Sequence, residues 1–175
     1  MKRPVDAFDY AGHICRMMKK GILLTTKSRE KVNTMTIGWG KIGVEWNRPI
    51  FIAYVRESRH TKKLLEENRE FTVNIPYGKT EGRILSYCGT KSGRDTDKIG
   101  DLGLDLVDSD VISVPGIRQL PLTLECRVIY AQRQDLRSMP EAVISRFYPV
   151  ESADGFRDYH IAYYGEIVNA YLIEE

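Results

Sequence analysis

The polar stretch Arg56-Glu57-Ser58-Arg59-His60-Thr61 lies between an apolar run and a short amphipathic segment. The N-terminus of a helix presents unpaired backbone N–H groups and a partial positive charge. Hydroxyls at Ser58 and Thr61, together with the Arg59 guanidinium, would complete a phosphate site there. The alternative is that Ser58 or Thr61 only caps the helix and that Arg59 is solvated. Taken alone, this stretch favours the cap.

Two further stretches carry polar groups that a ligand could use. The run from Cys88 to Lys98 combines glycines, hydroxyls and alternating charges, which suits a loop folded against a polar ligand. The alternative is a surface loop whose ion pairs contribute little to stability. The residues at 33–36 interrupt an otherwise apolar strand with polar groups, and a buried strand rarely carries so many unless a ligand uses them. An edge strand that faces water explains them equally well.

Gly38, Gly40 and Gly43 match the pattern G-x-G-x-x-G, which is typical of dinucleotide-binding turns. The pattern indicates such a turn only when a strand precedes it and a helix follows it. Residues 32–37 are rich in β-formers, but residues 44–49 show no helical period and end in a proline. We therefore predict that the three are strand glycines, which allow bends or the close approach of another backbone.

Other catalytic chemistry finds little support in the sequence. The three histidines have no metal-ligand spacing, so we predict no metal site. There is no G-x-S-x-G elbow for a serine hydrolase. The three cysteines include no C-x-x-C pair, which indicates free thiols in a reducing compartment. Cys88 could serve as a nucleophile, but a lone cysteine is more often a small buried hydrophobe.

Composition is that of an ordinary soluble globular protein. The chain has 175 residues, of which 42% are hydrophobic and 29% charged, and a net charge of +2. This near balance argues against a nucleic-acid partner. No apolar run approaches the roughly 20 residues of a membrane span, and the N-terminus lacks the apolar stretch of a signal peptide. We expect no membrane partner and a cytoplasmic location.

The elements that must position these residues are mostly strands. We predict one domain over residues 1–175, with helices at about 6–18, 60–68 and 84–88. Alternating or continuous apolar runs predict strands at 22–26, 32–40, 50–55, 71–75, 122–131 and 159–173. There is no regular alternation of strands and helices. This pattern favours a mainly β, antiparallel barrel with small helices packed outside it.

Taken in chain order, the motifs resemble the flavin reductase-like family of FMN-binding split barrels, close to flavoredoxin. The resemblance covers nearly the whole chain from about residue 20. The motifs in order are GILLTT (21–26), NTMTIGW (33–39), SRHT (58–61), FTVNIP (71–76), CGTKSGRDTDK (88–98), LECRV (124–128) and HIAYYGEI (160–167). The resemblance implies a six-stranded antiparallel Greek-key split barrel with short peripheral helices, homodimeric, with FMN in a groove at the dimer interface.

The resemblance also implies roles for particular residues. Four strand residues would line the isoalloxazine ring through backbone and side-chain groups: Asn33, Thr34, Met35 and Thr36. Three would hold the phosphate: Ser58, Arg59 and Thr61. Three would close over the flavin or its ribityl chain: Asn74, Ser92 and Lys98. His160 would lie beside the ring, where it steers a nicotinamide or donates a hydrogen bond to the reduced flavin. The alternative for His160 is a structural, half-buried histidine.

The implied function is that of an FMN-dependent oxidoreductase, which takes reducing equivalents from NADH or NADPH and passes them to a small-molecule or protein acceptor. One alternative is a flavoredoxin-like electron carrier with tightly held FMN and a protein redox partner. Another is a binding protein that has lost its flavin. A homodimer is also favoured by Tyr163 and Tyr164, which must point to opposite faces of one strand. Both cannot enter one core, and tyrosine is favoured at subunit interfaces. Substrate choice is expected to depend on the N-terminal helix and on residues 132–157.

Overall fold

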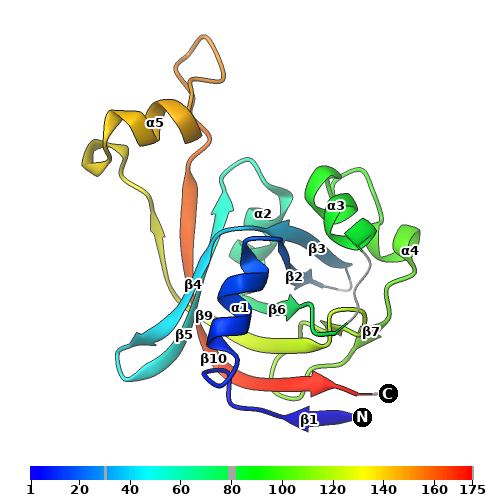
Figure 1. Ribbon diagram of the computed structural model, residues 1–175. Helices are drawn as coiled ribbons and strands as arrows, with labels where there is room; N and C mark the ends of the chain where they lie inside the picture. Colours follow the sequence, from blue (N-terminus) through cyan, green and yellow to red (C-terminus); the bar gives the residue numbers. More distant parts are fainter. Residues whose placement is uncertain (30, 79–81, 175) are drawn as a thin grey trace.

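The computed structural model describes residues 1–29, 31–78 and 82–174 (Figure 1). The strands are β1 (Lys2–Pro4), β2 (Ile22–Ser28), β3 (Lys31–Ile37), β4 (Gly40–Glu45), β5 (Arg48–Arg56), β6 (Glu70–Ile75), β7 (Leu106–Val107), β8 (Gly116–Ile117), β9 (Leu122–Arg133) and β10 (His160–Ile173). The helices are α1 (Ala11–Met18), α2 (His60–Glu67), α3 (Gly82–Thr90), α4 (Lys98–Leu102), the 3-10 turn η1 (Leu136–Ser138) and α5 (Glu141–Phe147).

Eight strands form one antiparallel sheet in the order β3-β2-β6-β9-β10-β5-β4, with β1 added to β10. Strands β7 and β8 form a separate antiparallel pair. The predicted fold class, a mainly β antiparallel structure with short peripheral helices, is confirmed, but the strand count differs from six. The predicted strand at 32–40 bends at Gly38, so that its end leaves β3 and pairs with β5 as β4. The pairing of β1 with β10 adds the other unpredicted strand of this sheet, and the pair β7 and β8 was not predicted either.

The helices cover both faces of this sheet. Helix α1 is shorter than the predicted 6–18 segment, because residues 7–10 form turns. The predicted helices at 60–68 and 84–88 are present as α2 and α3, whereas α4 and α5 were not predicted. In Figure 1, α1 lies in front of the sheet, and α3 and α4 lie beside β3.

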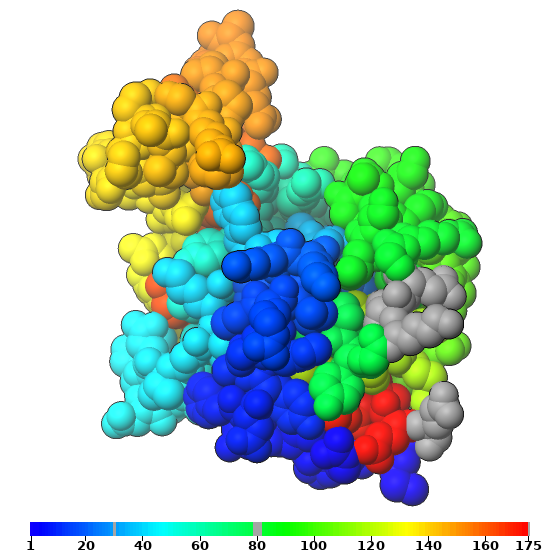
Figure 2. Space-filling view, viewed as in Figure 1, coloured from blue at the N-terminus to red at the C-terminus, as the bar shows by residue number. Residues whose placement is uncertain are grey.

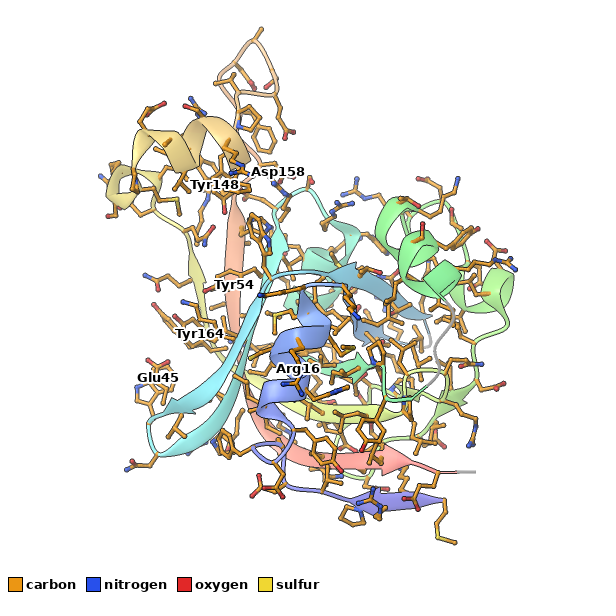
Figure 3. All side chains as sticks on the ribbon, viewed as in Figure 1. Arg16, Glu45, Tyr54, Tyr148, Asp158 and Tyr164 are labelled. Carbon is orange, nitrogen blue, oxygen red and sulfur yellow. The ribbon has the colours of Figure 1, made fainter. Side chains whose placement is uncertain are left out.

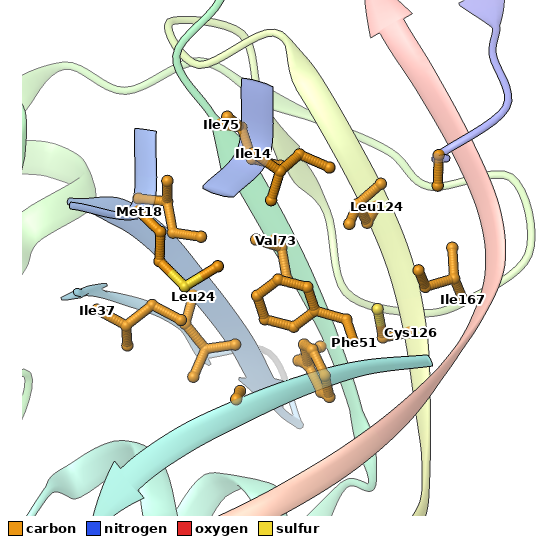
Figure 4. Packing of buried hydrophobic residues seen from close by; sticks show 14 of the residues in the cluster. Ile14, Met18, Leu24, Ile37, Phe51, Val73, Ile75, Leu124, Cys126 and Ile167 are labelled. Carbon is orange, nitrogen blue, oxygen red and sulfur yellow. The ribbon is translucent and has the colours of Figure 1, made fainter. Parts of the chain in front are cut away.

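Apolar side chains from β2, β5, β6, β9 and β10 fill the interior, and Ile14 and Met18 of α1 close it (Figure 4). A second, smaller cluster forms where α3 meets the outer face of β2, and it includes Leu23 and Cys88. Gly40 allows β4 to approach the first of these clusters closely, since a Cβ there would lie 3.0 Å from both Met18 Sδ and Phe51 Cζ. Two apolar layers therefore hold the sheet, one on each face.

The adjacent tyrosines of β10 separate as alternation requires. Tyr163 is buried in the core, with 4% of its surface exposed. Tyr164 is half-buried on the other face, where its ring centroid lies 5.0 Å from that of Tyr130 and 6.1 Å from that of Trp46. Trp46 and Tyr130 are 54% and 41% exposed. An aromatic surface thus lies on the outer side of β4, β9 and β10.

Residues 134–159 leave the sheet between β9 and β10 and carry η1 and α5; we call them the α5 excursion. Figures 1 and 2 show this segment projecting from the body of the molecule. Its base is attached to β5 by Arg56, whose guanidinium donates to the carbonyls of Asp158 (2.7 Å) and Phe147 (3.0 Å). Among the described residues, no helix is long and apolar enough to cross a membrane.

Candidate functional site

A cavity of about 260 Å³ opens where β3, the N-terminal end of α2 and the chain after α3 meet; we call it the cationic cavity. Its lining residues are Asn33, Met35, Ser58, Arg59, His60, Thr61, Cys88, Gly89, Lys91, Ser92, Gly93, Arg94 and Lys98. This set contains lysine and arginine side chains but no aspartate or glutamate. An anionic ligand would therefore meet uncompensated positive charge in the cavity.

Lys98 is the most deeply placed of these cations, with 4% of its surface exposed. Its Nζ donates to two backbone carbonyls, that of Thr34 at 2.8 Å and that of Cys88 at 3.2 Å. Burial lowers the pKa of the Lys98 ammonium from its usual range. A buried cation that has carbonyl partners and no carboxylate is stabilised by an anion that enters the cavity.

Hydrogen-bond donors accompany this charge. The Thr61 hydroxyl accepts from Asn33 Nδ2 at 3.1 Å, and Ser92 Oγ accepts from the Arg94 backbone N–H at 3.2 Å, so both hydroxyl protons remain available for a ligand. Helix α2 begins without a side-chain cap, which rules out the capping alternative for Ser58 and Thr61. His60 Nε2 is buried and has no hydrogen-bond partner among the described residues.

Gly93 holds the loop after α3 against β3. A Cβ at this position would lie 2.0 Å from Asn33 Oδ1, a separation that no real pair of atoms tolerates. Lys31 Nζ also donates to the Gly93 carbonyl at 3.1 Å. The absence of a side chain therefore shapes the wall of the cationic cavity.

A second cavity, of about 190 Å³, adjoins the first and shares Met35 and Arg59 with it. We call it the aromatic cavity, and its other lining residues are Thr36, Ile37, Gly38, Trp39, Tyr54, Arg56 and His160. The Trp39 ring lies 4.8 Å from the His160 ring and 5.3 Å from that of Phe147 in the α5 excursion. A flat, largely apolar ring is the kind of ligand group that this lining suits.

His160 is 7% exposed at the start of β10, and its Nδ1 lies 2.9 Å from the Tyr148 hydroxyl. Burial, with a smaller contribution from the nearby Arg56 guanidinium, lowers the pKa of His160 to about 4. The imidazole is therefore neutral at neutral pH. Figure 3 labels Tyr148 and Asp158 at the base of the α5 excursion and Tyr54 further along β5.

Most of the predicted cofactor residues lie together. Seven line the cationic cavity: Asn33, Met35, Ser58, Arg59, Thr61, Ser92 and Lys98. Thr36 and His160 line the aromatic cavity. The Ser58 hydroxyl donates to Asp158 Oδ2 at 2.6 Å, so that it can offer a ligand only its lone pairs.

Two predicted residues, Thr34 and Asn74, line neither cavity. The side chain of Thr34 accepts a hydrogen bond from Thr25 at 3.0 Å, and only its backbone carbonyl reaches the site, through Lys98. Asn74 is fully buried, its Nδ2 donates to Thr25 and Thr72, and its Oδ1 accepts from the Ile117 backbone N–H. Its amide is consumed by the protein interior, so a role over the flavin is a correction to our prediction.

Sequence reasoning missed several lining residues. Lys91 and Arg94 belong to the loop that we predicted to fold over a ligand, and their charge was the available signal. Trp39 lay within a quoted motif without an assigned role. Tyr148 lines neither cavity but contacts His160; it comes from the α5 excursion, where no pattern in the sequence pointed to the site.

A larger cavity of about 630 Å³ lies beyond Asn33 and Lys98, lined mainly by residues 93–100. Asp95 and Asp97 face it together with Lys31 and Arg94. Because carboxylates offset its cations, this cavity suits a phosphate less well than the cationic cavity does. Within the described ranges, no cluster of three or more histidine, cysteine, aspartate or glutamate side chains could hold a metal ion.

Comparison with known proteins gives one family. A family model described as "Flavin reductase like domain" matches residues 16–175. An uncharacterized protein of Archaeoglobus fulgidus is 33% identical over 100 residues, which is 57% of this chain and 55% of that protein. The chain thus spans little more than half the length of that relative.

Solved structures share the fold. A flavoredoxin from Methanosarcina acetivorans is 28% identical, with a TM-score of 0.63 over 88% of this chain and 68% of that one. An FMN-binding domain of a flavin reductases-like enzyme from Shewanella baltica OS155 is 15% identical, with a TM-score of 0.65 over 98% of this chain and 77% of that one. These likenesses confirm the predicted split-barrel fold class.

Proposed function

The chain belongs to the flavin reductase-like domain family, and on that premise we propose that it is an FMN-binding oxidoreductase of the flavin reductase type. Reducing equivalents would pass from NADH or NADPH through FMN to a small-molecule or protein acceptor. The observation that carries the proposal is the cationic cavity, with its lysine and arginine side chains, its hydroxyl donors and no carboxylate. It adjoins a cavity that suits a flat ring.

The residues present fit FMN. Among residues 1–29, 31–78 and 82–174, the buried Lys98 ammonium has carbonyl partners alone and His60 Nε2 has no hydrogen-bond partner. Both features are expected of a phosphate site. Lys98, Arg59 and Thr61 would hold the phosphate. Met35, Trp39 and His160 would contact the isoalloxazine ring. When bound, FMN supplies the acceptance and release of two electrons.

The chain's own contribution is binding and orientation. Charge-assisted hydrogen bonds from Arg59 and Lys98 would hold the phosphate end. Arg56 anchors the base of the α5 excursion, and Phe147 of that segment packs against Trp39. The base would therefore cover the ring end and limit its contact with water. A neutral His160 adds no positive charge beside the ring at neutral pH.

Two measurements test this proposal. Titration of the purified protein should show that FMN binds at least tenfold more tightly than riboflavin, which lacks the phosphate; equal affinities would contradict the assignment of the cationic cavity. Anaerobic mixing of the FMN-loaded protein with NADH or NADPH should then bleach the flavin absorbance rapidly with one of them.

The second candidate is a flavoredoxin-like electron carrier with tightly held FMN and a protein redox partner. The 28% identity to the Methanosarcina acetivorans flavoredoxin favours it. The mixing experiment separates the two functions. FMN that stays bound, but is bleached by neither nicotinamide, would favour the carrier over the reductase.

We also propose that the chain forms a homodimer through the aromatic surface of Trp46, Tyr130 and Tyr164. These rings pack against one another, yet Trp46 and Tyr130 keep 54% and 41% of their surface exposed. Exposed clustered aromatics are typical of protein interfaces. Light scattering at micromolar concentration should give a dimer, and Tyr130→Arg should give a monomer. A monomeric wild-type protein with FMN bound would contradict the proposal.

A further inference from the structure

The imidazole of His160 belongs to a short hydrogen-bonded chain at the base of the α5 excursion. Its Nδ1 lies 2.9 Å from the Tyr148 hydroxyl oxygen, and that oxygen lies 2.6 Å from Oε1 of Gln134. Tyr148 is 2% exposed, so that water does not compete for these bonds. The position of each proton in this hydrogen-bonded chain follows from the shorter distance and from the single proton of the phenol.

The shorter distance fixes the first proton. A separation of 2.6 Å is ordinary for O–H···O, whereas N–H···O bonds rarely fall below about 2.7 Å. Gln134 therefore presents its oxygen to Tyr148, and the Tyr148 hydroxyl donates to it. A phenol has one proton, so its oxygen can only accept from the second partner. The hydrogen atom between Tyr148 and His160 must then lie on Nδ1.

A neutral imidazole with a proton on Nδ1 has a lone pair on Nε2. His160 lines the aromatic cavity, and its Nε2 makes no hydrogen bond to residues 1–29, 31–78 or 82–174. Among these residues, the fully buried side-chain atoms without a hydrogen-bond partner are His60 Nε2 and the Tyr171 hydroxyl oxygen. His160 Nε2 also has no partner among them but is not one of these buried atoms, so it remains accessible from the cavity. The lone pair is available to a ligand.

We propose that Tyr148 is a positioning residue that holds His160 as the Nδ1–H tautomer, so that Nε2 accepts a hydrogen bond from an N–H or O–H group of the ligand. This reverses our expectation that His160 donates to the reduced flavin. The site selects for a ligand donor and against a ligand carbonyl at this point, because a carbonyl would face the lone pair. The hydrogen bond from the ligand to Nε2, the ligand half of the inference, rests on the proposed function. The assignment of the tautomer does not.

The experiment is long-range ¹H–¹⁵N correlation NMR of the histidine-labelled protein near pH 7, before and after addition of FMN. Such spectra show which ring nitrogen carries the proton. The variants His13→Gln and His60→Gln assign the remaining signals to His160. Wild-type His160 should show a protonated Nδ1 and an unprotonated Nε2.

Variants test the role of Tyr148. Tyr148→Phe keeps the ring that packs edge-on to His160 at 5.6 Å but removes the hydroxyl, and most His160 should then carry its proton on Nε2. Gln134→Leu frees the Tyr148 proton to point at Nδ1 and should produce the same change in a fold that keeps Tyr148. Gln134→Glu keeps an acceptor and should preserve the wild-type pattern.

A wild-type His160 protonated on Nε2 would overturn the inference, as would a tautomer unchanged in both Tyr148→Phe and Gln134→Leu. Addition of FMN should shift the His160 Nε2 resonance upfield, as expected when its lone pair accepts a hydrogen bond. FMN that binds without moving this resonance would overturn the ligand half alone. Failure of FMN to bind would overturn the proposed function and the ligand half together, whereas the tautomer is decided without flavin.

Discussion

Lys98→Met should weaken FMN binding far more than riboflavin binding. Methionine has nearly the length of lysine but no charge. Within the described part of the chain, the partners of the buried Lys98 ammonium are the Thr34 and Cys88 carbonyls alone. A phosphate charge at about 4 Å from the ammonium, at an effective dielectric constant of about 20, gains about 4 kcal/mol. Dehydration of the phosphate offsets part of this, which leaves about 1.5–3 kcal/mol, as for a hydrogen bond to a charged group.

This free energy corresponds to a roughly 10- to 100-fold rise in the Kd for FMN. Equilibrium titration followed by flavin fluorescence measures both ligands, and the Kd for riboflavin should change less than about twofold. Lys91→Met is the matched control, because Lys91 lines the same cavity but is exposed to water and should have a smaller effect. Lys98→Arg, which keeps the charge, should retain more affinity than Lys98→Met. An equal loss for FMN and riboflavin would refute the reasoning.

Three other predictions follow from the same geometry. Arg59→Ala should raise the Kd for FMN, at a cost of about 1.5–3 kcal/mol, and leave riboflavin nearly unaffected; titration with both ligands checks this, and parallel losses would remove Arg59 from the phosphate site. Gly93→Ala should displace the Asn33 amide, because its Cβ would lie 2.0 Å from Oδ1, and should reduce FMN affinity. Gly43→Ala should not, because no described residue lies within 4 Å of a Cβ there; equal FMN titrations for the two variants would contradict this. The pKa of His160 is lowered by burial and by Arg56 to about 4, below the unfolded value of about 6.5, so the unfolded chain binds more protons between these pH values and wild-type stability should rise with pH across that window. His160→Gln should flatten the rise in urea midpoints from pH 4 to 6.5, and an unchanged slope would show that His160 is not held neutral.

The fold was largely predictable because its strands follow local rules. The alternating run at Phe71–Ile75 and the long β-rich segment that begins at Leu122 correspond to β6 and β9. A bend was expected among the strand glycines, but the end of β3 just before Gly38 was not predicted, since the β-forming residues continue on both sides of it. Only the pairing of β4 with β5 decides where β3 ends.

The cationic cavity was partly predictable because its residues are local in sequence. The start of a helix adjoins Ser58, Arg59 and Thr61. The charged residues of the loop that contains Ser92 and Lys98 are evident in the sequence. Residues that act from the interior gave no such signal. Asn74 has the residue type of a ligand contact, yet both faces of this sheet are covered and its amide is satisfied inside the protein.

Tyr148 is the opposite case, a residue that contacts the site but was not predicted. It reaches His160 from the α5 excursion, which has no periodic pattern that would place it, and the contact depends on how that segment folds back over β5. A side chain that acts through another residue leaves no motif of its own. Such a contact becomes visible only in three dimensions.

The crystal structure of this protein with FMN tests the central claim most directly. The phosphate should lie in the cationic cavity, within hydrogen-bond distance of Lys98 Nζ and the Thr61 hydroxyl. The isoalloxazine ring should lie in the aromatic cavity beside Trp39 and His160. A phosphate bound instead in the larger cavity next to Asp95 and Asp97, or a ring away from His160, would contradict the account.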